Sequence, residues 1–259
     1  MKKKIITIIP ARMGSSRFPG KPLKKIKNFT MIEHCYYRSK LTKNVMLSYI
    51  ATCDKAIFDY CRERKINVMM TSKKHNRASD RVAEALKKIE KKHKLNFDII
   101  LMLQGDEPMV SPPMMEKLLS NFIKSRANVA NLICKMSKKK EIMDQNEIKV
   151  VKDKFNNAIY YSRNVIPHNV KKGFKSTYYK QVCAIPFLKN ALIKFNSLQE
   201  TFLEKSESID MMRLLENNKD VFLVKTDTNT YSVDNNQDLQ KVKKLMKLDK
   251  FIKKYEINR

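Results

Sequence analysis

Three cationic side chains lie close together near the start of the chain. Arg12, Arg17 and Lys21 fall within ten positions, directly after the apolar run at 5–9. Open α/β sheets bind ligands at the carboxyl ends of their strands, and cations beside inward-turned backbone amides make a pocket for a polyphosphate. The spacing matches neither the Walker phosphate loop nor the dinucleotide-binding glycine motif. The loop predicts a polyphosphate site of another kind, with a surface loop of solvated cations as the alternative.

The positions of the few glycines also indicate a ligand site in the loops that follow the apolar runs. There are four in all, and Gly14, Gly20 and Gly105 fall in this loop or in a second polar loop at 104–108, which follows the apolar run at 99–103. Glycine is needed where the backbone takes a positive φ or approaches a ligand closely. Both loops are therefore expected to be shaped around a ligand.

The second loop supplies carboxylates. Asp106 lies at the end of a predicted strand, where it is placed to hold Mg²⁺, a cation that prefers carboxylate and phosphate oxygens. One carboxylate rarely suffices, and we choose Asp234 as its partner because it ends a strand-like run and precedes the last predicted helix. From spacing alone, a helix N-cap is the favoured role for Asp234, and interaction with the helix dipole is favoured for Asp238. With Glu107 added, the site would also allow two metal ions.

The composition is that of one α/β domain spanning residues 1–259. At this length the chain can bury a proper core, and no apolar run approaches the roughly eighteen residues of a membrane helix. The apolar stretch at 5–9 is too short for a signal peptide. The five cysteines are scattered and never in C-x-x-C spacing, which argues against disulfides and a zinc site. We therefore expect a soluble, cytoplasmic protein without membrane insertion.

The formal net charge of +28 raises nucleic acid or an anionic membrane as possible partners. The lysines are spread through every segment rather than gathered in one stripe, which favours solvated faces over a nucleic-acid site. A positive field would still attract a triphosphate and a sugar acid. We expect no specific nucleic-acid partner.

The first half of the chain alternates strand-like runs with helical periodicity, which predicts a parallel sheet covered by helices. Strands are expected at 4–9, 47–51, 66–70, 98–103, 128–136, 148–152, 157–161, 178–187 and 221–226. Helices are expected at 31–41, 54–65, 79–93, 112–123 and 236–255. Asp54 and Ser79 are expected N-caps, and Pro112 and Pro113 open the fourth helix. The segment 162–177 is expected to be an irregular excursion or flap.

Several short segments, in order through nearly the whole chain, form a recognisable set. They are Pro10-Ala-Arg12, Ser16-Arg17, Pro19-Gly-Lys-Pro-Leu23, Met31-Ile32, Gln104-Gly-Asp-Glu-Pro108, Ser162-Arg-x-x-Ile-Pro167 and Val233-Asp234. Together they resemble the 3-deoxy-manno-octulosonate cytidylyltransferases, also called CMP-Kdo synthetases. The combination of the first loop with the Gln104 loop is highly specific for the synthesis of CMP-sugar acids.

The resemblance implies a Rossmann-like nucleotide-diphosphosugar transferase fold. In that fold a central, mostly parallel mixed sheet carries helices on both faces and a small antiparallel dimerisation excursion, here within about 155–215. The resemblance also implies a homodimer, Mg²⁺, CTP and the eight-carbon sugar acid Kdo, destined for lipopolysaccharide or another surface glycan. Asp106 and Asp234 would hold the metal, which overturns the capping role that spacing favours for Asp234. The residues implied at the nucleotide are Ala11, Arg12, Ser15, Ser16, Lys21, Arg77 and Asp106, of which Arg12, Lys21 and Asp106 would be catalytic.

The sugar-binding residues are expected mainly in the second half of the chain. Gln104 and Arg163 are candidates for the sugar's carboxylate and hydroxyls, since arginine binds a carboxylate bidentately. The segment Leu203-Glu-x-x-Glu-x-x-Asp-x-x-Arg213 matches an acidic helix of the family, which would turn Glu204 and Glu207 toward the sugar and the dimer side. A solvated acidic helix face is an equal alternative.

The chain also departs from the family's pattern. Where the family usually has an arginine after Met70-Thr71, this chain has Ser72, and the following S-G-T-[DE]-R segment becomes Arg77-Ala-Ser-Asp-Arg81. Arg77 would replace the lost cation. The K-H-x-G-x-Y segment becomes Lys180-Gln-Val-Cys-Ala-Ile185, so that Gln181 stands in place of a histidine expected near the sugar. The identity of the sugar acid is therefore open, and an amino-substituted octulosonate is among the choices.

The expected reaction is in-line attack of the anomeric hydroxyl of a 2-keto-3-deoxy sugar acid on the α-phosphorus of CTP, with release of pyrophosphate. Such chemistry depends mainly on positioning and on cationic stabilisation. No general base is evident, because His75 is a single histidine in a polar loop, where solvated or hydrogen-bonding roles are commoner. The alternatives are transfer to a nine-carbon, neuraminate-like acid, transfer from a nucleotide with another base, or a catalytically inactive basic protein that binds RNA or a membrane surface.

Overall fold

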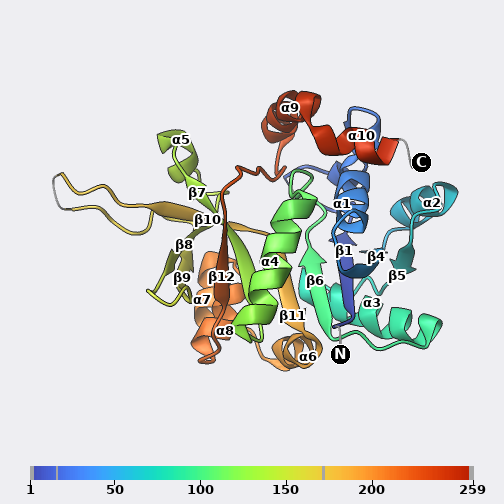
Figure 1. The fold of residues 1–259 in the computed structure, drawn as a ribbon, viewed down its shortest axis with the longest axis horizontal. Coiled ribbons are helices and arrows are strands. Elements are labelled where there is room, and N and C mark those ends of the chain that lie inside the picture. The colour runs from blue at the N-terminus through green and yellow to red at the C-terminus, as the bar shows by residue number, and fades with distance from the viewer. Residues whose placement is uncertain (1–2, 16, 171–172, 257–259) are drawn as a thin grey trace.

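The structure is a computed structural model that describes residues 3–15, 17–170 and 173–256 (Figure 1). Among these residues, five strands form a sheet in the order β11-β6-β1-β4-β5. β1 (Ile5–Ala11) pairs in parallel with β4 (Val45–Thr52) and β6 (Ile99–Leu103), and β4 pairs in parallel with β5 (Val68–Met70). β11 (Ala184–Leu188) runs antiparallel to β6. The predicted mixed, mostly parallel sheet is confirmed.

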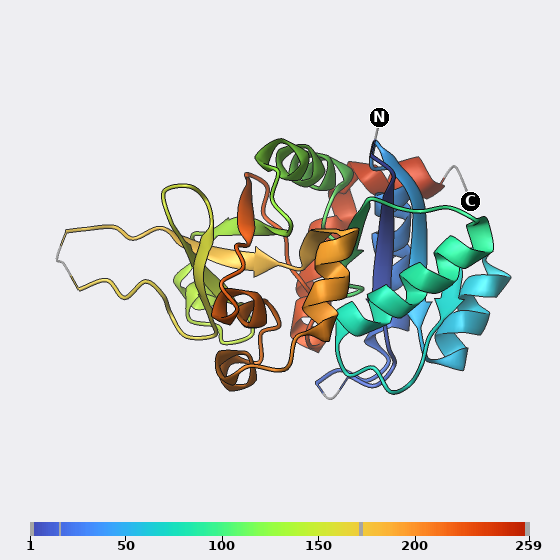
Figure 2. The same cartoon turned by 90° about the horizontal axis from the view of Figure 1, so that it is seen from below.

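Helices cover both faces of this sheet, as Figures 1 and 2 show. One face carries α1 (Met31–Lys40), α2 (Lys55–Glu63) and α4 (Pro112–Ser125), and the other carries α3 (Ala78–His93) and α6 (Lys189–Ser197). The side chains of β1 alternate between the two cores, with Ile5 and Ile9 in the first and Ile6 and Ile8 in the second. Burial on both sides explains why the strands read as continuous apolar runs.

A second sheet in the described ranges has five strands in the order β12-β7-β10-β8-β9. Its strands are β7 (Ala130–Met136), β8 (Lys149–Lys152), β9 (Ala158–Ser162), β10 (Tyr178–Val182) and β12 (Phe222–Thr226). The pairs β7–β10, β10–β8 and β8–β9 are antiparallel, whereas β12 runs parallel to β7. This mostly antiparallel sheet spans residues 130–226, so it extends well beyond the range of about 155–215 in which the family resemblance placed a small antiparallel excursion.

Short helices accompany the second sheet: α5 (Lys139–Ile142), α7 (Phe202–Glu207) and α8 (Met211–Glu216). Between β9 and β10, the described residues 163–170 and 173–177 contain no helix or strand. This loop projects away from the rest of the molecule in both ribbon views (Figures 1 and 2). The irregular excursion expected at 162–177 is therefore confirmed.

The C-terminal segment packs on the first loop. The elements here are η1 (Lys21–Leu23), β2 (Lys25–Ile26), β3 (Phe29–Thr30), α9 (Asn236–Leu245), η2 (Met246–Leu248) and α10 (Lys250–Glu256). A third core joins them, in which Ile26 and Phe29 meet Val242 and Tyr255. No helix in the part of the chain that the structure describes is long and apolar enough to cross a membrane.

Three sequence predictions about the elements are wrong in detail. The strand expected at 178–187 is two strands, because the chain crosses at Cys183 from the second sheet to the first. The helix expected at 236–255 is interrupted by η2, after which Asp249 accepts a hydrogen bond from the backbone N–H of Phe251. Ser79 is not an N-cap, since α3 already begins at Ala78.

Candidate active site

Two cavities open at the carboxyl ends of β1 and β6, which is where the sequence placed the ligand. The larger has a volume of about 330 Å³ and is lined by the first loop, by residues 76–78 and by Arg81. The smaller, of about 180 Å³, is lined by residues of β6, β10 and β11, by the segment 146–148 and by the start of α8. The two cavities share Arg17, Gln104, Asp106 and Asp210. They therefore form one continuous site with two compartments.

Local hydrogen bonds fix the first loop. The carbonyl oxygen of Met13 accepts from the backbone N–H groups of Ser15 (2.9 Å) and Gly20 (3.0 Å), and Gly20 has φ +70°, a conformation that favours glycine. The Asp54 carboxylate accepts a hydrogen bond from the Met13 backbone N–H at 2.8 Å. Asp54 does occupy the N-cap position of α2, as predicted, but its side chain makes no capping bond there. Its carboxylate holds the first loop instead.

Gly105 is required for a different reason. A Cβ atom at this position would lie 3.1 Å from the carbonyl oxygen of Pro10, so a side chain would push apart the ends of β1 and β6. The close approach brings the first loop and Asp106 to the same compartment. Gly14 has no such requirement, because a Cβ there would meet nothing within 4 Å among the described residues.

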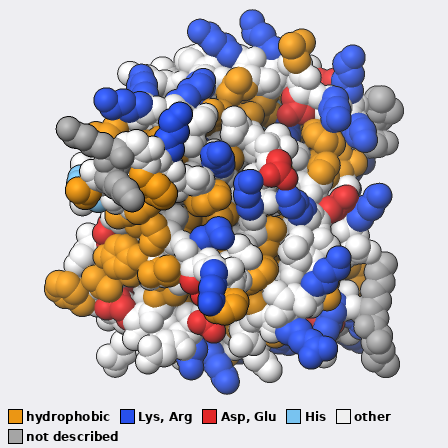
Figure 3. All heavy atoms as spheres, turned by 60° about the vertical axis from the view of Figure 1, so that its left-hand side comes forward, with side chains coloured by type: hydrophobic (Ala, Val, Ile, Leu, Met, Phe, Trp, Pro, Cys, Tyr) orange, Lys and Arg blue, Asp and Glu red, His pale blue; other side chains and the backbone are white. Residues whose placement is uncertain are grey.

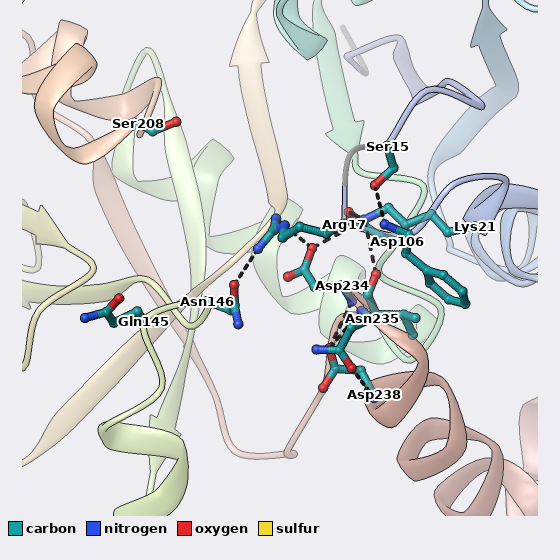
Figure 4. Close-up of polar contacts among 12 residues, drawn as sticks. Ser15, Arg17, Lys21, Asp106, Gln145, Asn146, Ser208, Asp234, Asn235 and Asp238 are labelled. Atoms are coloured by element: carbon teal, nitrogen blue, oxygen red, sulfur yellow. Dashed lines mark hydrogen bonds and ion pairs between the residues drawn. The ribbon is translucent and has the colours of Figure 1, made fainter.

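Lys21 forms ion pairs with both Asp106 and Asp234, the two aspartates expected to hold the metal. Its ammonium donates to Asp106 Oδ2 at 2.6 Å, to Asp234 Oδ1 at 3.4 Å and to the Val233 carbonyl oxygen at 3.1 Å. The backbone N–H of Val233 in turn donates to the carbonyl oxygen of Asp106 at 3.0 Å. Figure 4 shows the three charged side chains turned toward one another from the first loop, the Gln104 loop and the segment before α9. Two carboxylates far apart in sequence thus meet at one cation.

Asp234 is available for this site because another residue caps the last helix. Asn235 is the N-cap of α9, and its side-chain oxygen accepts from the Asp238 backbone N–H at 3.0 Å. The Asp238 carboxylate in turn accepts a hydrogen bond from the Asn235 backbone N–H, which completes a capping box. The capping role that spacing favoured for Asp234 is wrong, and the first-turn position expected for Asp238 is confirmed.

The charged groups in this cluster shift one another's pKa values. Burial acts to lower the pKa of Lys21, but the charges of Asp106 and Asp234 and the hydrogen bonds to them outweigh it and raise that pKa. Burial and the nearby charge of Asp106 raise the pKa of Asp234. The two carboxylates therefore repel each other, and a cation between them relieves the repulsion.

The same arrangement fits a divalent metal ion. Asp106 and Asp234 present oxygens to one point; Asp106 lines both cavities and Asp234 lines the smaller one. No group of three or more histidine, cysteine or acidic side chains that could hold a metal occurs among the described residues. Mg²⁺ usually binds through one or two carboxylates, with substrate phosphates and water completing its shell. The residues present therefore fit a Mg²⁺ ion that is bound together with a polyphosphate.

Two arginines of the first loop play different parts. Arg17 donates to Asp234 Oδ1 at 2.9 Å and to Asn146 Oδ1 at 2.5 Å, so it bridges the boundary between the compartments (Figure 4). Arg12 lines the larger cavity and forms no hydrogen bond or ion pair with any residue that the structure describes. Its guanidinium is therefore unpaired among the described residues. Ala11 and Ser15 line the same cavity, and the predicted Ser16 lies outside the described residues.

The start of α3 contributes the far wall of the larger cavity. Arg77 lines it and pairs with Asp80 through Nε (2.9 Å) and Nη2 (3.1 Å), which leaves Nη1 buried without a hydrogen-bond partner among the described residues. Arg81 also lines it, and donates to Thr71 Oγ1 at 2.6 Å. His75 instead bonds Glu84 and lines neither cavity, as its expected minor role implied.

The smaller cavity holds most of the residues proposed for the sugar. Gln104 lines both compartments, and its side-chain amide makes no hydrogen bond within the described ranges. Arg163 lines the smaller one and donates to the carbonyl oxygens of Gln145, Glu207 and Ser208, which uses three of its five N–H groups. Gln181 lines it too, with its Nε2 atom held by Asn131 at 2.9 Å.

Glu204 and Glu207 lie outside the linings of both cavities. The Glu204 carboxylate is buried against Arg213 and bonds the Thr201 backbone N–H at the start of α7. Glu207 accepts from Ser162 Oγ at 2.8 Å and from the Arg163 backbone N–H at 3.0 Å. Both carboxylates therefore hold the second sheet and its helices together rather than facing the cavities.

Some lining residues were missing from the sequence prediction. Arg81 and Asp210 belong to segments that carry the resemblance, so the motif itself was the signal that pointed to them. Arg17 was counted as a loop cation but not as a residue of the site. Asn146 had no signal, because it lies in a polar stretch without periodicity.

Comparisons with known proteins agree with this geometry. A family model described as cytidylyltransferase matches residues 6–221. The 3-deoxy-manno-octulosonate cytidylyltransferase of Fusobacterium nucleatum is 35% identical over 240 residues, which cover 92% of this chain and 95% of that protein. The protein of the same name from Solibacter usitatus is 33% identical over 248 residues, which cover 95% of this chain and 96% of that one.

Solved structures lead to the same relatives. The chain is similar to the structure of CMP:2-keto-3-deoxy-manno-octonic acid synthetase complexed with CTP, with a TM-score of 0.84 and 32% identity over 94% of this chain and 98% of that one. A crystal structure of 4-diphosphocytidyl-2C-methyl-D-erythritol synthase has a TM-score of 0.64 at 14% identity, over 94% of this chain and 100% of that one, and shares the fold. These relatives give no support to the neuraminate, RNA-binding or membrane-surface alternatives. The chain therefore belongs to the cytidylyltransferase family, in which its relatives are the 3-deoxy-manno-octulosonate cytidylyltransferases, and it is a nucleotidyltransferase enzyme.

Proposed function

We propose that this enzyme transfers CMP from CTP to the anomeric hydroxyl of Kdo, or of a close relative of Kdo, and releases pyrophosphate. The observation that carries the proposal is the meeting of Asp106 and Asp234 at Lys21, where the two compartments join. The larger compartment, with its free Arg12, suits the triphosphate nucleotide. The smaller compartment, with Gln104 and Arg163, suits a sugar acid.

The cations of the larger compartment bind and orient the triphosphate. Arg12 has its full set of donors available, and Arg77 has a buried Nη1 without a partner among the described residues. Lys21 and Arg17 neutralise the negative charges of Asp106 and Asp234. When a divalent ion binds the two carboxylates, these cations would turn to phosphate oxygens of the nucleotide. Charge that develops on the phosphoryl oxygens and on the departing pyrophosphate is then met by preorganised cations.

Mg²⁺ is the cofactor that this site supports, with Asp106 and Asp234 as its protein ligands. Bound with CTP, the ion would supply positive charge at the phosphoryl group and the leaving pyrophosphate. Lys21 keeps both carboxylates directed at this point through its hydrogen bonds.

The smaller compartment positions the acceptor. Arg163 retains two N–H groups beyond the three that bind carbonyl oxygens, and these suit the sugar's carboxylate. The Gln104 amide, at the junction of the compartments, suits a hydroxyl near the reacting centre. No described residue is placed as a general base, so positioning is the main contribution of the chain.

We also propose that the enzyme is a homodimer formed through the second sheet. β9 is an edge strand of that sheet, and its Ile159 is 59% exposed. Phe155, Phe174 and Val170 on the adjoining turns and loop are exposed as well. Figure 3, which brings this end of the molecule forward, shows hydrophobic side chains gathered on its left-hand half. A contiguous apolar surface at an unpaired sheet edge is typical of a protein interface.

The cytoplasm is the compartment we propose for the enzyme. All five cysteines are free thiols in the structure, which suits a reducing environment. The product would be an activated sugar acid for lipopolysaccharide or another surface glycan.

The function is tested with purified protein, CTP, Mg²⁺ and Kdo. We expect stoichiometric pyrophosphate and a product with the mass of CMP-Kdo, and no product when Mg²⁺ is chelated. ATP, GTP and UTP in place of CTP, and N-acetylneuraminate in place of Kdo, are the controls. Faster turnover with the nine-carbon acid, or none with any octulosonate, would reject the proposal.

A further inference from the structure

The smaller cavity is bordered by a segment without helix or strand, residues 143–148, which joins α5 to β8. We call it the α5–β8 segment, and three of its residues line the cavity. Two arginines of the site contact it. Arg17 donates to Asn146 Oδ1 at 2.5 Å, and Arg163 donates to the Gln145 carbonyl oxygen at 3.1 Å. The segment therefore connects the cation at the junction of the compartments with the cation proposed for the sugar's carboxylate.

Two buried lysines fasten the α5–β8 segment. Of the lysines in the described ranges, only Lys149 and Lys180 are buried. The Lys149 ammonium donates to the carbonyl oxygens of Asp144 at 2.8 Å and of Glu147 at 2.7 Å, on either side of Asn146 in the sequence. The Lys180 ammonium donates to the Glu147 carboxylate at 2.9 Å. Both ammonium groups therefore bind oxygens of the same short segment.

Burial of these two ammonium groups opposes their positive charge. Burial lowers the pKa of Lys149 below its ordinary value. At Lys180 burial acts in the same direction, but the charges of Glu147 and Glu141 outweigh it and raise the pKa. Removing an ammonium from water is costly unless oxygens replace its hydration, and most of the replacing oxygens belong to the α5–β8 segment. A shift of the segment would leave buried charge without partners, so the lysines hold it in one conformation.

Local hydrogen bonds orient the side chain of Asn146, which lines the smaller cavity. Asp144 Oδ1 accepts from the Asn146 backbone N–H at 2.9 Å and from Asn146 Nδ2 at 3.1 Å. Arg17, which donates to Asn146 Oδ1, also donates to Asp234 at 2.9 Å, so it links the amide to an aspartate proposed for the metal (Figure 4). A side-chain amide has two N–H donors and an oxygen with two lone pairs. Among the described residues, one donor and one lone pair of Asn146 therefore remain for a ligand.

We propose that Asn146 is a binding residue for a hydroxyl of Kdo, and that Lys149 is the positioning residue that fixes Asn146 at the cavity. The inference rests on the proposed function, since it takes the smaller cavity as the acceptor compartment. The Asn146 amide offers a donor and an acceptor to a hydroxyl, while Arg163 binds the sugar's carboxylate. When Arg17 turns to the phosphate oxygens of CTP, Asn146 Oδ1 is released for the acceptor. A neutral amide also adds no negative charge beside the sugar's own carboxylate.

Steady-state kinetics of Asn146→Ala with CTP, Mg²⁺ and Kdo test the binding role. We expect the KM for Kdo to rise about three- to tenfold, which is the size of one lost hydrogen bond, while the KM for CTP changes less than about twofold. Gln145→Ala is the matched control and should change neither value. Gln145 is the exposed neighbour, its side chain lines neither cavity, and it contacts Arg163 only through its backbone carbonyl.

A raised KM for CTP with an unchanged KM for Kdo in Asn146→Ala would mean that Asn146 only holds Arg17 for the nucleotide, which overturns the inference. Equal effects of Asn146→Ala and Gln145→Ala overturn it as well. Both results leave the proposed function intact. Absence of product from the unmodified enzyme with CTP and Kdo rejects the proposed function and the inference together.

Lys149→Met tests the positioning role. Without the ammonium the α5–β8 segment is released, so the KM for Kdo should rise, and adding Asn146→Ala should raise it no further, because both changes remove one contact. Lys152→Met is the matched control on the same strand, since Lys152 donates instead to Asn156 Oδ1 at 2.8 Å in the turn before β9. KM does not depend on the fraction of folded enzyme, so a loss of stability leaves the readout valid. An unchanged KM for Kdo in Lys149→Met, or additive effects in the double variant, rejects the positioning role.

Discussion

Replacing Lys21 by methionine tests the charge balance of the site. The Lys21 side chain is 13% exposed, and those of Asp106 and Asp234 are 19% and 15% exposed, so the cluster is largely shielded from water. At an effective dielectric constant of about 20, contacts of 2.6 and 3.4 Å correspond to gross attractions of about 6 and 5 kcal/mol. Desolvation offsets most of this, and removing one partner of a buried pair costs about 3–5 kcal/mol. We expect Lys21→Met to lose about 3 kcal/mol.

A loss of that size lowers the melting temperature by roughly 6–12 °C in a chain of this length. Lys21 has a raised pKa, so its contribution is fully present below its ordinary value of 10.5 and is lost only as the pH rises through the folded value. The loss in Lys21→Met should therefore be constant between about pH 6 and pH 9. Burial and the charge of Asp106 raise the pKa of Asp234, so the variant should recover stability as acid protonates that carboxylate.

The assay is differential scanning calorimetry of both proteins with and without Mg²⁺. Because the metal no longer competes with an ammonium, Mg²⁺ should raise the melting temperature of Lys21→Met more than that of the unmodified protein. Turnover should fall by about 10²–10³ through loss of a preorganised cation. Lys25→Met, an exposed lysine on β2, is the control and should change neither property. A drop of less than about 2 °C, with equal Mg²⁺ stabilisation of both proteins, would refute the reasoning.

Three further predictions follow from the same geometry. Asp234→Asn should abolish Mg²⁺-dependent turnover with a melting temperature within about 2 °C of the unmodified protein, because Asn235 caps α9 and because burial and the charge of Asp106 raise the pKa of Asp234, so that a neutral side chain is tolerated there; a large stability loss would contradict this. Burial and the charge of Asp106 raise the pKa of Glu107 from 4.5 to about 8, so stability from this group falls as the pH rises between those values. In EDTA, urea unfolding should show Glu107→Gln gaining about 1 kcal/mol or more relative to the unmodified protein at pH 8 compared with pH 5, whereas equal differences at both pH values would disprove the assignment. Ile159→Glu should yield a monomer in sedimentation analysis, while Leu248→Glu, at an even more exposed position but on the C-terminal segment, should leave the dimer unchanged; a dimeric Ile159→Glu would count against the proposed interface.

The elements of the first half of the chain were predictable because their signals are local. Apolar runs bounded by polar loops predicted β1, β4 and β6, and glycine placement identified the loops that line the larger cavity. Gly20 and Gly105 meet the physical requirement that made them informative. The same logic does not explain Gly14, whose position is open in the described structure.

Features that depend on tertiary contacts were harder to predict. Spacing favoured Asp234 as a cap, and the family resemblance supplied its pairing with Asp106. The competing cap, Asn235, is adjacent in sequence, and propensity alone does not choose between the two. The sequence does not reveal that the chain passes from one sheet to the other at Cys183, because an apolar run that continues through two sheets has the pattern of a single strand. The contact of Arg17 with Asn146 joins a loop to a segment that has no pattern of its own.

The most direct test of the account is the position of a divalent ion in crystals grown with CTP and Mn²⁺. Mn²⁺ substitutes for Mg²⁺ at oxygen sites and gives an anomalous signal. We expect an anomalous peak within about 2.5 Å of carboxylate oxygens of both Asp106 and Asp234, in contact with the triphosphate, with Lys21 turned away from at least one of the two. Mn²⁺ bound to CTP without contact to either aspartate would contradict the central claim.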